Sequence, residues 1–173
     1  MKKTEKRILP SLLTLLGAAL LIVVDQWLKQ LAVEHLKPQG IYPLWDGVFQ
    51  LTYVENHGAA FGIFAGEKIF LVWITGLLLA AMVGLLLFRK ITHPCLLVSF
   101  GLIIGGGVGN LIDRVLYSYV VDYLHVTLIN FAVFNFADCC VVVGTLLLLV
   151  YFLFFDRKES DPPQTAPKEE PHA

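Results

Sequence analysis

Four long apolar runs dominate the chain, and the middle of each run carries no charged residue. A helix needs about 20 predominantly apolar residues to cross a bilayer. The runs therefore predict transmembrane helices over about residues 8–28, 69–88, 94–112 and 133–155. We expect a mainly α-helical integral membrane protein built from these four helices.

The first run follows a basic stretch and begins like a secretory signal peptide. No small-residue cleavage site follows it, and it ends instead in the segment from Asp25 to Lys29. We interpret this run as an uncleaved first transmembrane helix. Asp25 and Lys29 share one helical face, so they either form an interfacial ion pair that ends the helix or support a nearby site. The sequence leaves both interpretations open.

The segment between the first and second runs is too polar and too rich in glycine and proline to span a bilayer. Within it, Phe49, Leu51 and Tyr53 recur at every second position, which is typical of a strand. We expect a small extramembrane β-ribbon over about residues 36–62, between helices 1 and 2 on the outer face. Aromatic side chains that would rest on the membrane surface are Trp45, Phe49 and Phe61.

The composition agrees with a membrane protein, because 57% of the residues are hydrophobic and the mean hydropathy is +0.71. We expect one membrane domain over residues 1–155 and a disordered cytoplasmic tail over residues 156–173. A net charge of −1 offers no basic surface, so no nucleic-acid partner is expected. The cysteines at 95, 139 and 140 lie in apolar runs and are expected to be packing residues.

Basic residues are unequally divided between the two sides of the predicted helices. One side has Lys2, Lys3, Lys6, Arg7, Arg89, Lys90, Arg157 and Lys158, whereas the other has Lys29, Lys37, Lys68 and Arg114. By the positive-inside rule the richer side is cytoplasmic. We therefore expect both termini in the cytoplasm and the ribbon on the outer side.

Polar residues gather at the predicted outer ends of the helices. They are Asp25, Asn56, Asn110, Asp113, Asp122 and Asp138. Ionisable residues near hydrocarbon are costly and normally mark function, and a shared depth predicts one site. Asn110, Asp113 and Arg114 share a face at the end of the third helix. Asn135 and Asp138 share a face at the start of the fourth.

Two carboxyl groups within hydrogen-bond distance share a proton, so one can take a proton from water while the other donates one. This is the chemistry of aspartic proteases. We expect Asp138, near a helix N-terminus, to be favoured as an anion, and we expect the apolar neighbours of Asp122 to raise its pKa. The chain has no H-x-x-x-H pair and no G-x-S-x-G motif. We therefore expect no metal, no other cofactor and no serine nucleophile.

Five motifs occur in order along the chain: DQWLK (25–29), NHGAAFG (56–62), GNLIDR (109–114), VVDY (120–123) and FNFAD (134–138). Together they resemble the motif set of the lipoprotein signal peptidases, also called signal peptidase II. The resemblance implies a multi-pass enzyme of the bacterial cytoplasmic (inner) membrane with its active site at the outer face. Its aspartyl dyad would cleave diacylglyceryl-modified prolipoproteins just before the lipidated cysteine. The catalytic aspartates of the family fall on Asp122 and Asp138.

The same resemblance implies supporting or substrate-binding roles for Asp25, Lys29, Asn56, Gly58, Asn110, Asp113, Arg114 and Asn135. Two positions depart from the family pattern. Ser118 replaces a glycine that usually precedes the VVD motif, and Tyr123 replaces a common phenylalanine. The expected partners are diacylglyceryl-prolipoproteins and membrane lipid, and we expect a monomer.

Two other functions are compatible with membrane carboxylates. A small proton-coupled transporter is expected to carry ionisable residues near the bilayer midplane, whereas here they gather at one end of the helices. A non-enzymatic membrane assembly factor would use the aspartates only as structural groups. Substitution of the aspartates distinguishes these functions from peptide cleavage.

Overall fold

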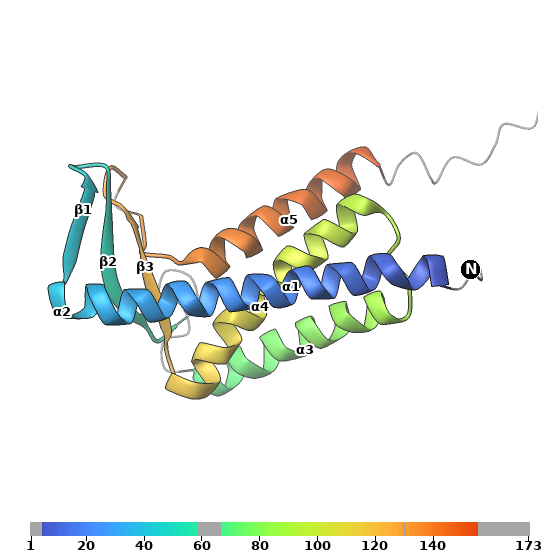
Figure 1. Cartoon of the computed structure of the whole chain (residues 1–173), viewed down its shortest axis with the longest axis horizontal. Coiled ribbons are helices and arrows are strands. Elements are labelled where there is room, and N and C mark those ends of the chain that lie inside the picture. Colours follow the sequence, from blue (N-terminus) through green and yellow to red (C-terminus); the bar gives the residue numbers. More distant parts are fainter. Residues whose placement is uncertain (1–4, 59–66, 130, 156–173) are drawn as a thin grey trace, which may run out of the picture.

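Four long helices pack together, and a small sheet lies at one end of them (Figure 1). The structure is a computed structural model and describes residues 5–58, 67–129 and 131–155. The helices are α1 (Glu5–Leu31), α3 (Lys68–Leu87), α4 (Pro94–Tyr117) and α5 (Phe136–Phe154). Each belongs to a helical segment that is long and apolar enough to cross a membrane. The predicted fold class is confirmed.

Several predicted features lie outside the described residues. They are Lys2, Lys3, residues 59–62 of the predicted ribbon with Phe61, and the tail over 156–173.

The first helical segment does not end at the predicted residue 28. Helix α1 continues into the π-helical turn η1 (Ala32–Leu36) and the short helix α2 (Lys37–Gln39). Asp25 and Lys29 do not end the helix, because both side chains are buried against other elements. Gly40, with a positive φ of 82°, ends the helical segment. The ribbon therefore begins at residue 41 and not at residue 36.

Helices α4 and α5 also differ from their predicted bounds. Helix α4 passes residue 112 and continues to Tyr117, because Asp113 is buried and not exposed to water. Helix α5 begins at Phe136 and not at residue 133, because Asn135 and Asp138 form a capping box. The Asn135 side chain accepts from the Asp138 N–H at 2.9 Å, and the Asp138 carboxylate accepts from the Asn135 N–H at 3.1 Å.

The sheet has three antiparallel strands in the order β1-β2-β3. Strands β1 (Ile41–Trp45) and β2 (Phe49–Asn56) form the predicted ribbon between helices 1 and 2. The third strand, β3 (Val120–Val126), comes from the connection between α4 and α5. Its Asp122 pairs with Val54 of β2, so the sheet holds the VVDY motif next to the end of β2.

Glycines let α4 lie close to its neighbours. A Cβ added at Gly101 or Gly105 would meet Thr14 or Leu21 of α1, and a Cβ at Gly106 would collide with the Ala137 carbonyl of α5. The glycine face of α4 is therefore a packing surface for α1, and Gly106 extends close packing to α5. Helix α4 contacts α1, α3 and α5, which makes it the central helix.

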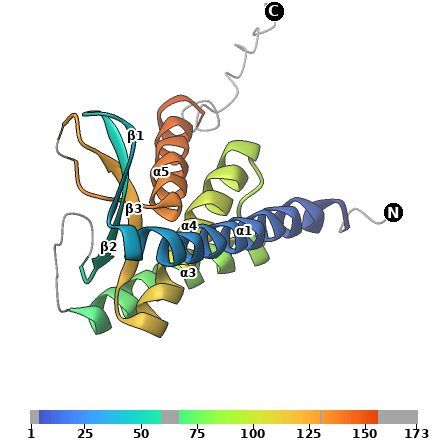
Figure 2. The ribbon, with the colours of Figure 1, turned by 60° about the vertical axis from the view of Figure 1, so that its left-hand side comes forward.

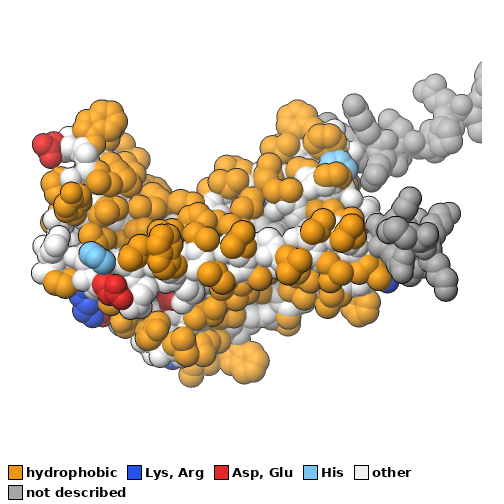
Figure 3. Space-filling model, viewed as in Figure 1, with side chains coloured by type: hydrophobic (Ala, Val, Ile, Leu, Met, Phe, Trp, Pro, Cys, Tyr) orange, Lys and Arg blue, Asp and Glu red, His pale blue; other side chains and the backbone are white. Residues whose placement is uncertain are grey.

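Hydrophobic side chains cover most of the helical part in the view of Figure 3. Leu16, Trp73 and Phe152 are among the many large apolar residues that are more than half exposed. This distribution is typical of helices that face lipid. Figures 1 and 2 both place the sheet at one end of the helices, and the N-terminal end of α1 and the α3–α4 connection at the opposite end.

Candidate active site

The sheet end of α1, α4 and α5 meets β2 and β3 in one polar network. All of the predicted site residues belong to it through hydrogen bonds or ion pairs. Among the residues that the structure describes, no buried side-chain nitrogen or oxygen lacks a hydrogen-bond partner. The shared depth that the sequence indicates thus corresponds to direct contact.

Asp122 is the buried carboxylate of β3, with only 2% of its surface exposed. Its Oδ1 accepts from Asn135 Nδ2 at 2.7 Å, and its Oδ2 accepts from Asn56 Nδ2 at 3.0 Å. Burial raises the pKa of Asp122 to about 6; the two amide donors oppose this rise, and the charge of Asp138 adds to it. The carboxyl group therefore holds a proton more tightly than an ordinary aspartate.

Asp138 lies in the first turn of α5 and shares one of these partners, Asn135, with Asp122. Its Oδ1 accepts from Asn110 Nδ2 at 2.8 Å, and its Oδ2 accepts from the backbone N–H of Asn135. Asn135 contacts both carboxylates, since its side-chain amide reaches Asp122 while its backbone reaches Asp138. One fully buried residue thus holds the two acids next to each other.

A buried ionic cluster lies next to the two carboxylates. Lys29 Nζ lies 2.8 Å from Asp25 Oδ2 and 3.1 Å from Asp113 Oδ2, and it donates to Asn110 Oδ1 at 2.8 Å. The Asp25–Lys29 pair is therefore not an interfacial pair at a helix end, because it is buried and Lys29 contacts a residue that binds Asp138. Of the two interpretations that the sequence leaves open, this contact favours support of a site.

The two aspartates of this cluster tie the helices to their neighbours. Asp25 Oδ1 accepts from the Ala137 N–H of α5 at 3.1 Å, and Asp113 Oδ2 accepts from the Val121 N–H of β3 at 3.1 Å. Asp113 thus fixes the backbone of the residue before Asp122. Asp113 therefore helps to position β3 through a backbone contact.

Gln26 also belongs to this cluster, although it is not among the predicted site residues. Its Nε2 donates to Asp113 Oδ1 at 2.9 Å and to the Gly109 carbonyl at 3.2 Å. The signal in the sequence is an amide beside Asp25 within a helix that is otherwise apolar. A Cβ at Gly109 would collide with the Asp25 carboxylate, so this glycine makes room for the cluster.

Arg114 joins the end of β2 to α4. Its Nη2 donates to the Gly58 carbonyl at 3.1 Å and its Nη1 to the Asn110 carbonyl at 3.3 Å. The Gly58 N–H donates in turn to Asn56 Oδ1 at 2.9 Å. This arrangement orients the Asn56 amide so that its nitrogen faces Asp122.

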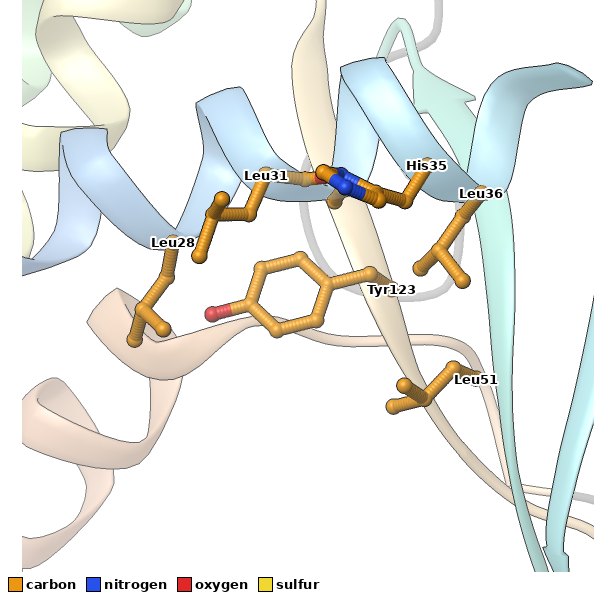
Figure 4. Close-up of a pocket in the computed structure, with 7 residues that line it drawn as sticks. Leu28, Leu31, His35, Leu36, Leu51 and Tyr123 are labelled. Atoms are coloured by element: carbon orange, nitrogen blue, oxygen red, sulfur yellow. The ribbon is translucent and has the colours of Figure 1, made fainter.

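An apolar pocket of about 420 Å³ lies on the other face of β3 (Figure 4). Alternation along the strand turns Tyr123 toward this pocket, whereas Asp122 faces the polar network. The pocket is lined by Leu28, Leu31, Ala32, His35, Leu36, Leu51 and Tyr123. It contains no carboxylate, so it is separate from the candidate active site. The Tyr123 hydroxyl accepts from the Phe136 N–H at 3.3 Å and satisfies a donor at the start of α5.

No group of three histidine, cysteine or acidic side chains among the described residues is arranged to hold a metal ion. The carboxylates of the site are instead bonded to amides, backbone N–H groups and Lys29.

Fold and site together define a multi-pass membrane protein with two neighbouring acids at one end of its helices. The family model of signal peptidase (SPase) II matches residues 17–154. The chain belongs to the signal peptidase II family.

Curated relatives agree with this assignment. The lipoprotein signal peptidase of Chlorobium phaeobacteroides is 43% identical over 140 residues, which cover 75% of this chain and 88% of that protein. The lipoprotein signal peptidase of Clostridium acetobutylicum is 40% identical over 148 residues, which cover 84% of this chain and 96% of that protein.

Solved structures have the same fold. A bacterial membrane enzyme determined at 2.3 Å resolution has a TM-score of 0.77 and 27% identity, and the match covers 90% of this chain and 94% of that one. A second bacterial membrane enzyme, at 1.9 Å resolution, has a TM-score of 0.73 and 28% identity over 82% and 93% of the two chains.

Proposed function

We propose that this protein is an aspartic endopeptidase that removes signal peptides from diacylglyceryl-modified prolipoproteins by cleaving before the lipidated cysteine. Membership of the signal peptidase II family supports the removal of signal peptides from prolipoproteins. The observation that carries the aspartic mechanism is the pair of neighbouring acids, Asp122 and Asp138, held by Asn135.

Hydrolysis needs one group that takes a proton from water and one that gives a proton to the leaving amine. Two adjacent carboxyl groups that share a proton supply both. The raised pKa of Asp122 supports the presence of such a shared proton near neutral pH. The buried network around the pair limits the access of bulk water, which strengthens the electrostatic interactions within the site.

The same proposal places the site at the outer face of the cytoplasmic membrane. The α3–α4 connection, with Arg89 and Lys90, lies at the end opposite the sheet, and the positive-inside rule assigns that end to the cytoplasm. A substrate whose signal peptide is itself a membrane helix would then reach the site by lateral diffusion. Its acyl chains would remain in the surrounding lipid, and a monomer would suffice because all site residues come from one chain.

A proton-coupled transporter is not favoured, because the acids lie at the sheet end of the helices and the family comparisons indicate a peptidase. Substitution of the two aspartates distinguishes a peptidase from an assembly factor in which the aspartates are purely structural.

The test is to replace Asp122→Asn and Asp138→Asn separately and to follow cleavage of a lipidated prolipoprotein by the purified full chain in detergent. Each variant is expected to lose at least about a thousandfold in kcat/KM, because one partner of the pair no longer transfers a proton. Asp46→Asn, at an exposed turn of the sheet, is the matched control and should cleave normally. Near-normal cleavage by either site variant would refute the aspartic mechanism.

A further inference from the structure

Lys29 fixes the orientation of the Asn110 side chain. An ammonium group only donates hydrogen bonds, so the side-chain atom of Asn110 that lies 2.8 Å from Lys29 Nζ must be the oxygen. The amide nitrogen of Asn110 therefore faces Asp138 Oδ1, to which it donates at 2.8 Å. The positive charge of Lys29 polarises this amide and strengthens its N–H as a donor.

Both oxygens of Asp138 thus face groups that only donate. Oδ1 faces the amide that Lys29 holds in place, and Oδ2 faces the backbone N–H of Asn135 at 3.1 Å. The carboxyl group also lies at the N-terminus of α5, where unpaired N–H groups favour negative charge. Each of these contacts is better satisfied by a carboxylate than by a protonated acid.

Asp122 has a different environment. Its two oxygens accept from the side-chain amides of Asn135 and Asn56. The oxygens of these two amides accept from the backbone N–H groups of Asp138 and Gly58 and not from a cation. Burial and the nearby negative charge of Asp138 both raise the pKa of Asp122.

The charged and titratable groups around Asp138 come from every neighbouring element. They are Asp25 and Lys29 of α1, Asp113 and Arg114 of α4, Asp122 and Tyr123 of β3, and Cys139 of α5. Of the two cations in this set, Lys29 donates to the side-chain oxygen of the amide that binds Asp138, whereas Arg114 donates to the backbone carbonyl of Asn110.

We propose that Lys29, acting through Asn110, keeps Asp138 as the carboxylate that takes a proton from the attacking water, and that Asp122 holds the proton for the leaving amine. The proposal rests on the aspartic mechanism of the preceding section. Lys29 and Asn110 are positioning residues, because they act through Asp138.

Cleavage by this route uses only the attacking water, the substrate and the two acids. The water oxygen bonds to the scissile carbonyl carbon, its proton goes to Asp138, and the carbonyl oxygen takes the negative charge. The carbonyl then re-forms as the carbon–nitrogen bond breaks, and the nitrogen takes the proton of Asp122. Transfer of the proton from Asp138 to Asp122 restores the starting state, and no oxidant or reductant is needed.

The pH dependence of kcat/KM separates the two roles, because its rising limb reports the base and its falling limb the acid of the free enzyme. Asn110→Ser removes the donor to Asp138 and should move the rising limb up by about one pH unit. Asn56→Ser removes a donor to Asp122 and should move the falling limb upward instead.

Lys29→Gln tests the charge itself and should move the rising limb in the same direction as Asn110→Ser. Lys37→Gln is the matched control, since it also removes a lysine from an ion pair, with Glu55, but at an exposed site. It should leave both limbs unchanged. Where Lys29→Gln does not fold, Asn110→Ser decides, because the ion pairs of Lys29 with Asp25 and Asp113 remain intact.

Three results would overturn the assignment. Asn110→Ser could move the falling limb and Asn56→Ser the rising limb, or both limbs could move equally in both variants. The third result is a rising limb that does not move in folded Asn110→Ser. The aspartate variants distinguish this outcome from failure of the aspartic mechanism. If Asp122→Asn and Asp138→Asn are inactive and the rising limb does not move, only the division of roles is wrong. If an aspartate variant remains active, the mechanism itself is wrong.

Discussion

Asn135 combines a structural and a chemical task at a single position. Its side chain caps α5, and the same side chain donates to the Asp122 carboxylate. The sequence indicates the first task, because Asn-x-x-Asp before an apolar run is a helix start signal. The second depends on β3 lying beside α5, which no local pattern of the sequence contains.

The raised pKa of Asp122 has a consequence for stability. The carboxyl group has an ordinary pKa of 3.8 and a folded value of about 6. As the pH rises between these values, the unfolded chain loses its proton before the folded protein does. The free energy of unfolding should therefore fall by about 3 kcal/mol across this window and then remain level.

Asp122→Asn removes this titration. The free energy of unfolding of the variant minus that of the unmodified protein should therefore rise by about 3 kcal/mol between about pH 4 and pH 7. The measurement is unfolding in detergent at a series of pH values. Glu55→Gln is the control of opposite sign, and its effect lies at lower pH, because Lys37 and Tyr53 lower the pKa of Glu55 from its ordinary value of 4.5. A pH-independent difference for Asp122→Asn would contradict the raised pKa.

At the scale of elements, the helices and the ribbon could be predicted because their patterns are local. Uncharged runs of membrane length indicate the helices, and period-two alternation indicates β2. Strand β3 could not be predicted, because its partner β2 lies far upstream and VVDYLHV alone is a short apolar run. The helix ends were misplaced where Asp25 and Asp113 are buried by other helices, since burial is not visible in one segment.

The turn between α4 and β3 gives a prediction at the same scale. Ser118 ends α4 with φ of 73°, a left-handed conformation that favours glycine. Ser118→Gly should therefore stabilise the protein by about 0.5–1 kcal/mol, partly offset by the loss of the exposed hydrogen bond from Lys68. Thermal unfolding in detergent checks this, with Ser118→Ala as the control that loses the hydroxyl and keeps the strain. Lower stability of Ser118→Gly than of Ser118→Ala would contradict it.

At the scale of the molecule, the polar network lies at one end of a bundle whose outer surface is apolar. The sequence predicted the common depth of its members, because positions in transmembrane helices translate directly into depth. It did not predict the contacts that join them, such as Lys29 to Asn110 or Asn56 to Asp122, because these depend on how the helices rotate and on the sheet.

At the scale of the whole molecule, the testable property is its orientation in the membrane. Asp46 lies in the exposed turn between β1 and β2, and Lys90 in the connection between α3 and α4. In a variant without its native cysteines, Asp46→Cys should react in intact spheroplasts with a maleimide that does not cross membranes. Lys90→Cys should react only after lysis, because eight basic residues favour a cytoplasmic location for its side of the membrane. Each variant must still cleave prolipoprotein, so that labelling reports the active fold. Protection of position 46 with labelling of position 90 would place the two acids on the cytoplasmic side and contradict the proposed outer-face site.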